Sequence, residues 1–220
     1  MLQRFRNRTQ AGKLLAAQLT EYANRPDVLV LGLPRGGVPV AYEVAKELDA
    51  PLDVCLVRKL GVPGHKELAM CAIATGGVRA INVNVVDWLR ISPETINQVA
   101  AIEMRELDRR SHTYRGNRPL LKVKNHTIIL VDDGIATGAT IRAAIATLKK
   151  QQPGKLVVAV PVAAASTCEE LQAEVDQVVC VMMPEDLCAI GIWYEDFQQT
   201  TDTEVCELLT RQQLLVANNS

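Results

Sequence analysis

The sequence is poor in the residues that build several common kinds of site. Its six cysteines form no C-x-x-C pair, and we interpret them as small buried side chains of a protein in a reducing compartment. The three histidines, His65, His112 and His126, are far apart, which disfavours a zinc site. Neither a G-x-x-x-x-G-K-S/T loop nor a G-x-G-x-x-G turn follows a strand-like run, which argues against the common nucleotide-binding motifs.

An excess of charge and long apolar runs are also missing. The net charge of −1 at pH 7 disfavours a general attraction to nucleic acid or to an anionic membrane. No apolar run approaches the roughly 20 residues that span a bilayer. Residues 1–19 lack a long apolar core and a cleavage site, so we expect an amphipathic helix there and not a secretory signal. Together these features predict a cytoplasmic protein without a membrane segment.

Strand-like and helix-like segments alternate along the chain. We predict strands at 28–31, 52–57, 128–131, 156–160 and 178–182, and helices at 9–23, 38–48, 93–110, 139–150 and 166–173. Asp202 is the expected cap of a last helix that ends near residue 216. Glycine and proline at 59–66 predict a loop, and Gly76-Gly77 between the runs 69–74 and 78–83 predicts a hairpin.

This alternation predicts an α/β fold with a mainly parallel sheet and helices on both faces, because the strands are continuously apolar. The chain shows no linker, so we expect residues 1–220 to form one domain with its core at about 25–182. Ligands of such sheets bind at the carboxyl ends of the strands. The residues that directly follow each strand are therefore the first candidates for a ligand site.

The segment 127–140, TIILVDDGIATGAT, carries the strongest signal. Its apolar strand ends at Asp132 and Asp133, and a flexible turn with small and hydroxyl residues leads into the next helix. The amino end of a helix offers unpaired N–H groups and partial positive charge, which suit a phosphate. Two carboxylates beside it suit sugar hydroxyls and a hard cation such as Mg²⁺. We interpret the segment as a phosphorylated-sugar site, although helix-capping aspartates in an ordinary strand-turn-helix are the alternative.

The same segment resembles the phosphoribosyl pyrophosphate (PRPP) motif of type I phosphoribosyltransferases: an apolar strand, two acidic residues, then Gly-x-x-Thr-Gly-x-Thr. The resemblance implies a PRPP- and Mg²⁺-dependent transfer to a nitrogen acceptor in nucleotide metabolism, with release of pyrophosphate. It makes Asp132 and Asp133 catalytic residues and metal ligands. The residues that it implies for PRPP binding in this loop are Gly134, Ala136, Thr137, Gly138, Ala139 and Thr140.

A second signal lies at 31–41, LGLPRGGVPVA, where a glycine turn again joins a strand to a helix. Gly36 and Gly37 allow the backbone to approach a ligand closely, and Arg35 supplies a planar, permanently charged group for phosphate oxygens. The turn looks like the pyrophosphate loop of the same family, which implies a catalytic Arg35 and a strained Arg35–Gly36 peptide. A tight turn with a solvated arginine is the alternative.

A third signal is the stretch 58–77, where the family places a mobile lid over PRPP. The resemblance implies that Lys59, Lys66 and His65 are candidate cations for the leaving pyrophosphate, with Lys59 as a catalytic residue and Lys66 as a PRPP ligand. A polar surface loop is the alternative, especially for His65. Relatives are often dimers, so the resemblance also implies a homodimer.

The acceptor is less well specified by the sequence. Hypoxanthine-guanine enzymes carry an aspartate where this chain has Ala136, which disfavours a 6-oxopurine and removes the expected general base. Glu67, Glu195 and Asp196 remain open as its replacement. The family covers its acceptor with a small hood, which we expect from residues 183–220 and the N-terminal helix. The aromatic side chains expected to bind the acceptor are Trp193, Tyr194 and Phe197, with core packing as the alternative.

A non-catalytic PRPP sensor that binds RNA is the competing hypothesis. It requires a basic surface, and the only candidate is the arginine-rich stretch 105–118. Glu103, Glu106 and Asp108 interleave with these arginines, so a solvated helix face explains the stretch better. The acceptor, and the choice between catalysis and sensing, stay open at the level of the sequence.

Overall fold

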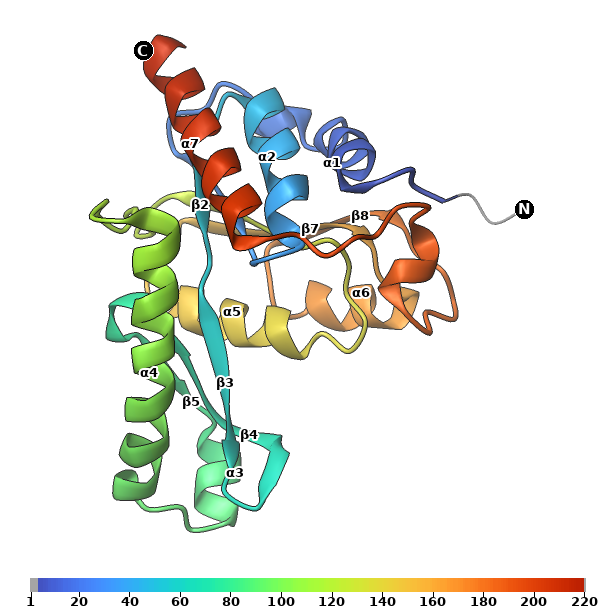
Figure 1. Cartoon of the computed structure of the whole chain (residues 1–220). Coiled ribbons are helices and arrows are strands. Elements are labelled where there is room, and N and C mark those ends of the chain that lie inside the picture. Colours follow the sequence, from blue (N-terminus) through green and yellow to red (C-terminus); the bar gives the residue numbers. More distant parts are fainter. Residues whose placement is uncertain (1–3, 220) are drawn as a thin grey trace. The chain divides into compact units, whose positions relative to one another are not determined.

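The computed structural model describes residues 4–219 and divides into two compact units (Figure 1). The first unit contains the described residues up to Cys55, together with 121–138 and 153–219. The second contains 56–120 and 139–152. Because each unit is assembled from separate stretches, no single linker divides them, and one domain over residues 1–220 stays a prediction.

A five-stranded parallel sheet forms the centre of the first unit, in the order β2-β1-β6-β7-β8. Its strands are β1 (Val28–Gly32), β2 (Leu52–Val54), β6 (Thr127–Val131), β7 (Lys155–Val162) and β8 (Gln177–Met182). All five residues of β1 and of β6 are buried, as expected for central strands with both faces covered. The predicted α/β fold with a parallel sheet is therefore confirmed.

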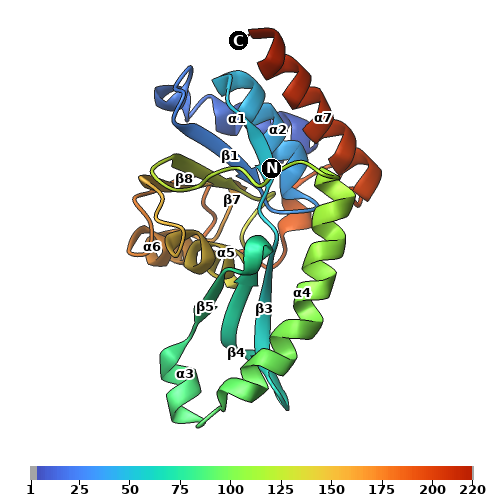
Figure 2. The same cartoon turned by 90° about the vertical axis from the view of Figure 1, so that its left-hand side faces the viewer.

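Four helices accompany this sheet. They are α1 (Arg8–Ala16), α2 (Gly37–Leu48), α6 (Ala165–Gln172) and α7 (Asp202–Asn219). Figures 1 and 2 show α1 and α2 on one face, with α7 against α2, and α6 on the other face. The short 3-10 turns η1 (Thr20–Tyr22) and η3 (Ile190–Trp193) complete the unit.

Two predicted helix boundaries in this unit are wrong. The first helix ends at Ala16 instead of residue 23, and the chain continues into η1, where Leu19 and Tyr22 stay buried without a continuous helix. Asp202 is the first residue of α7 and not its cap. The hydroxyl of Thr201 accepts the N–H of Glu204 at 3.1 Å and caps the helix instead.

The second unit contains a three-stranded antiparallel sheet, in the order β3-β4-β5. Its strands are β3 (Val57–Val62), β4 (His65–Ala74) and β5 (Arg79–Ile81), with η2 (Thr75–Gly77) before the last. The helices are α3 (Val83–Trp88), α4 (Pro93–Arg115) and α5 (Ala139–Lys149). The predicted pairing on both sides of Gly76-Gly77 is confirmed. The predicted loop at 59–66 is wrong, because Leu60 and Val62 alternate into the interior of a β3–β4 hairpin.

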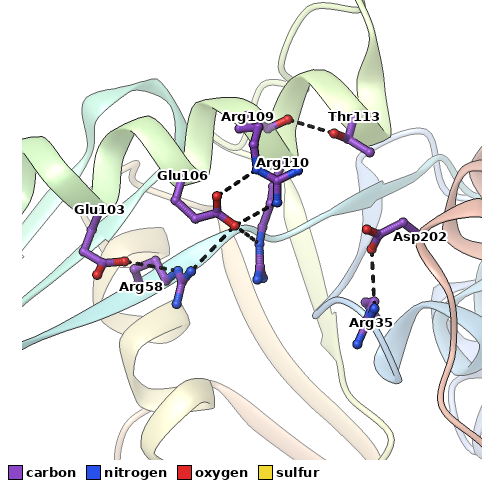
Figure 3. Close-up of polar contacts among 8 residues, drawn as sticks. All are labelled: Arg35, Arg58, Glu103, Glu106, Arg109, Arg110, Thr113 and Asp202. Atoms are coloured by element: carbon purple, nitrogen blue, oxygen red, sulfur yellow. Dashed lines mark hydrogen bonds and ion pairs between the residues drawn. The ribbon is translucent and has the colours of Figure 1, made fainter.

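A network of ion pairs occupies the charged face of α4 (Figure 3). Ser92 caps this helix as predicted, because its hydroxyl accepts the N–H of Thr95 at 3.2 Å. Glu106 accepts from Arg109 and Arg110, each through Nε at 2.8 Å. These hydrogen bonds, that of Arg109 first, lower the pKa of Glu106 to about 2. Arg58 on β3 lies 3.4 Å from Glu103 and 3.8 Å from Glu106, so these acidic side chains pair with the neighbouring strand as well as within the helix (Figure 3).

Candidate functional site

The two glycine-containing turns of the first unit meet at the acidic pair. Strands β1 and β6 are neighbours in register from Val28–Thr127 to Gly32–Val131, so their carboxyl ends lie side by side. The N–H of Leu33 then donates to the carbonyl of Val131 at 2.8 Å. This pairing carries the turn 34–37 alongside Asp132 and Asp133. The structure thus brings the two strongest sequence signals together at one edge of the sheet.

Two glycines allow the close contact between these turns. A Cβ at Gly36 would lie 2.0 Å from Oδ2 of Asp133, and one at Gly37 would lie 2.8 Å from both Cα of Asp132 and the carbonyl oxygen of Val131. These separations are far below van der Waals contact. The absence of both side chains is therefore what lets the acidic pair and the turn share this edge.

Arg35 lies at the start of the same turn. The peptide bond between Pro34 and Arg35 is cis, one position before the Arg35–Gly36 bond that the family resemblance marked. The guanidinium Nη1 is 3.9 Å from Oδ1 of Asp202, at the first residue of α7 (Figure 3). The Arg35 side chain is 37% exposed, so this distant pair leaves it accessible to an anion.

The two carboxylates have different surroundings. Asp132 is half-buried, and its Oδ1 accepts the N–H of Asp133 at 2.9 Å. Burial, and then the negative charge of Asp133, raise the pKa of Asp132 well above its ordinary value. A cation bound beside the pair would favour the ionised form of both groups. The pair therefore has the electrostatics of a site that gains from a positive ligand.

Arg8 contacts Asp133 from the start of α1, and the sequence analysis missed it. Its Nε and Nη2 each lie 2.8 Å from Oδ2 of Asp133, and both side chains are 12% exposed. Its Nη1 donates to the carbonyl of Gln198 at 2.7 Å, and the guanidinium lies 4.0 Å from the centre of the Phe197 ring. No local motif marks Arg8, because these partners are 125 and 190 positions away along the chain.

The segment 190–198 packs against the N-terminal segment. Phe5 donates its N–H to the carbonyl of Trp193 at 2.9 Å, and its own carbonyl accepts from Glu195 at 2.8 Å. Trp193 and Tyr194 are 8% and 3% exposed, in one apolar cluster with Phe5. This placement favours packing over acceptor contact for both residues. Phe197 is half-buried and stacks on Tyr194, while its ring is also covered by Arg8.

Tyr194 supports the acidic pair through its hydroxyl, which donates to the carbonyl of Asp133 at 2.6 Å. Burial, and then the charge of Asp133, raise the pKa of this phenol, so it remains a neutral donor. We expect Tyr194→Phe to lower the free energy of unfolding by about 1–3 kcal/mol, because a buried carbonyl loses its partner. Urea unfolding measures this change. Tyr42→Phe at a half-buried tyrosine is the control, and equal losses in both variants would contradict the role of the Tyr194 bond.

The turn after the acidic pair combines one anchored residue with exposed ones. Ile135 donates its N–H to the carbonyl of Val162 at 2.9 Å, which ties the turn to β7. Ala136 and Thr137 are exposed, and Gly138 has a φ of +72°, which favours glycine. Ala139 and Thr140, both exposed, follow directly as the first residues of α5. The turn therefore exposes four of the residues that the sequence predicted for phosphate binding, while Gly138 between them is buried.

Comparisons with known proteins agree with this geometry. The profile of a family described as "Phosphoribosyl transferase domain" matches residues 1–189. The chain belongs to this family. A Mycobacterium tuberculosis protein named "Putative phosphoribosyl transferase Rv0571c" is 42% identical over 207 residues, which are 94% of this chain and 46% of that protein. The chain thus spans about half the length of the curated relatives that it matches.

Solved structures show the same fold. The crystal structure of TT1426 from Thermus thermophilus matches with a TM-score of 0.86 and 40% identity, over 95% of this chain and 99% of that one. The AQ2163 protein from Aquifex aeolicus matches with a TM-score of 0.51 and 11% identity, over 84% of this chain and 78% of that one, which concerns the fold alone.

The carboxylates of this phosphoribosyl transferase domain fit a Mg²⁺ ion that is also bound by a substrate. Within residues 4–219, no group of three or more histidine, cysteine, aspartate or glutamate side chains is placed to hold a metal ion. Asp132 and Asp133 offer two carboxylates. Mg²⁺ commonly binds through one or two carboxylates plus substrate phosphates and water, and not in an all-protein cage. These two residues would hold it, and the phosphate oxygens of a substrate would complete its ligands.

The remaining site residues that the sequence predicted belong to the second unit. Lys59 is half-buried on β3, and His65 is exposed at the start of β4. Lys66 and Glu67 lie on β4, and their side chains are outside the part of the chain that the structure describes. The roles of these residues in the phosphoribosyl transferase domain stay predictions. In the part of the chain that is described, no helix is both long and apolar enough to cross a membrane.

Proposed function

We propose that this chain transfers the phosphoribosyl group of PRPP to a nitrogen of a nucleobase-like ring and releases pyrophosphate, with Mg²⁺ as cofactor. The observation that carries the proposal is the meeting of two turns, after β1 and β6, at a carboxylate pair that Gly36 and Gly37 approach closely. A sugar diphosphate needs this combination. Its hydroxyls require hydrogen-bond acceptors, and its phosphates require backbone N–H and cationic donors. Its size requires neighbouring residues without side chains, so that the ligand can approach the backbone.

In the proposed reaction, the bond from C1 of the ribose to the pyrophosphate oxygen breaks and a bond from the acceptor nitrogen to C1 forms. Positive charge develops on the sugar ring, by analogy with other glycosyl transfers. Asp132 and Asp133 bind the ribose hydroxyls and stabilise that charge. Residues 136–140 bind the 5′-phosphate through N–H and hydroxyl groups. When bound, Mg²⁺ supplies positive charge to the phosphate oxygens.

The departing pyrophosphate needs further positive charge. Arg35 is a candidate in the first unit, since it precedes the two glycines and is partly exposed. The family resemblance assigns Lys59 and Lys66 to the same task, and this assignment remains part of the proposal. A planar Arg35 guanidinium can bind two phosphate oxygens at once, which a lysine cannot do.

The acceptor is proposed only as a flat, nitrogen-containing ring. Ala136 provides no carboxylate for the ring, and Glu195 and Asp196 are exposed and remain candidates for the base. We also infer a cytoplasmic homodimer. Light-scattering mass tests the dimer, since one chain has a mass of 24.1 kDa.

The proposal is tested in two steps. Titration calorimetry should detect PRPP binding in the presence of Mg²⁺ and much weaker binding with EDTA, because the carboxylates alone repel the anion. A panel of nucleobases and related ring compounds should then contain at least one that supports release of pyrophosphate. PRPP that produces no heat with Mg²⁺ present would rule out the proposed reaction.

A PRPP sensor that binds RNA is the alternative, and α4 supports it poorly. Arg109 and Arg110 pair with Glu106, and Arg118 donates to the carbonyls of Tyr114 and Arg115. The carboxylate and carbonyl groups that accept from these arginines reduce the cationic surface that is left for a phosphate backbone. Retention of RNA that falls steeply with salt concentration, without turnover on any ring compound, would favour the sensor.

A further inference from the structure

Arg8 is the described side chain that touches both the acidic pair and the segment 190–198. Its Nε and Nη2 hold Oδ2 of Asp133, and its Nη1 holds the carbonyl of Gln198. The face of its guanidinium covers Phe197. One planar group therefore makes three kinds of contact at once, which is the behaviour that distinguishes arginine from lysine.

The contact with Asp133 constrains that carboxylate. Both nitrogen contacts go to Oδ2, so Oδ1 lies outside the ion pair. The carbonyl of the same residue is held by the hydroxyl of Tyr194, and its N–H by Oδ1 of Asp132. Asp133 is thus fixed at its backbone and at one carboxylate oxygen. Under the proposed function, the ribose hydroxyls would meet Asp133 in this fixed orientation.

The charge of Arg8 also matters for an anionic substrate. Asp132 and Asp133 together carry two negative charges when ionised, which repel a polyphosphate. A guanidinium that is only 12% exposed and lies 2.8 Å from one carboxylate compensates one of those charges. Removal of the cation would leave an unpaired carboxylate in a site that is mostly screened from water, which is strongly unfavourable.

We propose that Arg8 is a positioning residue of the PRPP site, which holds Asp133 for the ribose and ties the segment 190–198 to it. This inference rests on the proposed function. It assigns to the N-terminal helix a part in substrate binding, through Asp133 and not through direct contact with the substrate. Lysine at this position would keep the charge but would lose the simultaneous contacts with Asp133, Gln198 and Phe197.

The test compares Arg8→Ala, Arg8→Lys and Arg6→Ala. Arg6 is the matched control, an exposed arginine two positions away that lies outside the site. Calorimetry with PRPP and Mg²⁺ should show about tenfold weaker binding for Arg8→Ala and an intermediate loss for Arg8→Lys. Arg6→Ala should bind as the parent protein does. With an active ring compound, KM for PRPP should rise more than kcat falls, because Arg8 acts on binding geometry.

Two further measurements separate this role from a structural one. Thermal unfolding reports any loss of stability, and Arg8→Lys provides a folded variant if Arg8→Ala does not fold. Asp133→Asn combined with Arg8→Lys should bind PRPP as Asp133→Asn alone does, because Arg8 acts through Asp133.

The outcomes are distinct. If the parent protein binds PRPP and the Arg8 variants bind it with equal affinity, Arg8 has no positioning role, but the proposed function still stands. If the Arg8 variants are less stable but bind PRPP with unchanged affinity, the positioning role is also overturned, since Arg8 then contributes to stability only. Parent protein that fails to bind PRPP overturns the proposed function, and the role of Arg8 falls with it.

Discussion

Asp132→Asn combined with Asp133→Asn should reduce Mg²⁺-dependent PRPP binding by at least about a hundredfold, because two charged acceptors for a cation and for ribose hydroxyls become neutral amides. The substitutions preserve side-chain size, so steric effects are small. Calorimetry with PRPP and Mg²⁺ measures the loss, and release of pyrophosphate with an active ring compound should fall at least as far.

The control for this pair is Asp87→Asn, an exposed aspartate on α3, which should bind PRPP as the parent protein does. Circular dichroism and urea unfolding would show whether the double variant keeps the fold, since Arg8 loses a charged partner in it. A folded double variant with unchanged PRPP affinity would contradict the assignment of the acidic pair to the substrate.

Gly37→Ala should lower both stability and PRPP binding, whereas Gly36→Ala should mainly lower binding. At Gly37 the new Cβ meets backbone atoms of Val131 and Asp132, which cannot move without displacing β6, so we expect a loss of about 1–3 kcal/mol. At Gly36 the Cβ meets the carboxylate of Asp133, which can rotate away from Arg8. Urea unfolding and PRPP calorimetry on both variants measure the two effects separately.

Gly116→Ala is the matched control for these glycines. Gly116 has a φ of +58° and open space where a Cβ would stand, so its substitution introduces backbone strain of about 1–3 kcal/mol without a steric contact. It should leave PRPP affinity unchanged. If Gly36→Ala also bound PRPP normally, the close approach of the turn to Asp133 would have no role in the substrate site.

The acidic pair and the glycine turn were predictable because their chemistry is local. An apolar strand followed by small and charged residues predicts both a buried strand and the position of its carboxyl end. Once β1 and β6 are parallel neighbours, these ends must meet. The cap at Ser92 was predictable for the same reason, since a hydroxyl three residues before a free N–H is a short-range pattern.

The hairpin of β3 and β4 was not predictable from composition. Glycine, proline and lysine at 59–66 favour a loop, yet the partner strand and the burial of Leu60 and Val62 impose extended structure. Tertiary packing overrides local propensity most easily in strands, because their hydrogen bonds are made with distant residues. The helix cap is Thr201 and not the predicted Asp202, because the helix begins one residue earlier than expected. Sequence patterns rarely resolve a helix boundary to one residue.

By itself, the sequence determined the parallel α/β architecture, the phosphoribosyl transferase motif and the residues that follow β1 and β6, because periodicity and strand ends depend on neighbours along the chain. Only the tertiary structure decided that Arg8 pairs with Asp133, that the hydroxyl of Tyr194 supports the same residue, and that Trp193 is buried. Those contacts join residues more than 60 positions apart, and packing that selects such partners depends on the whole fold.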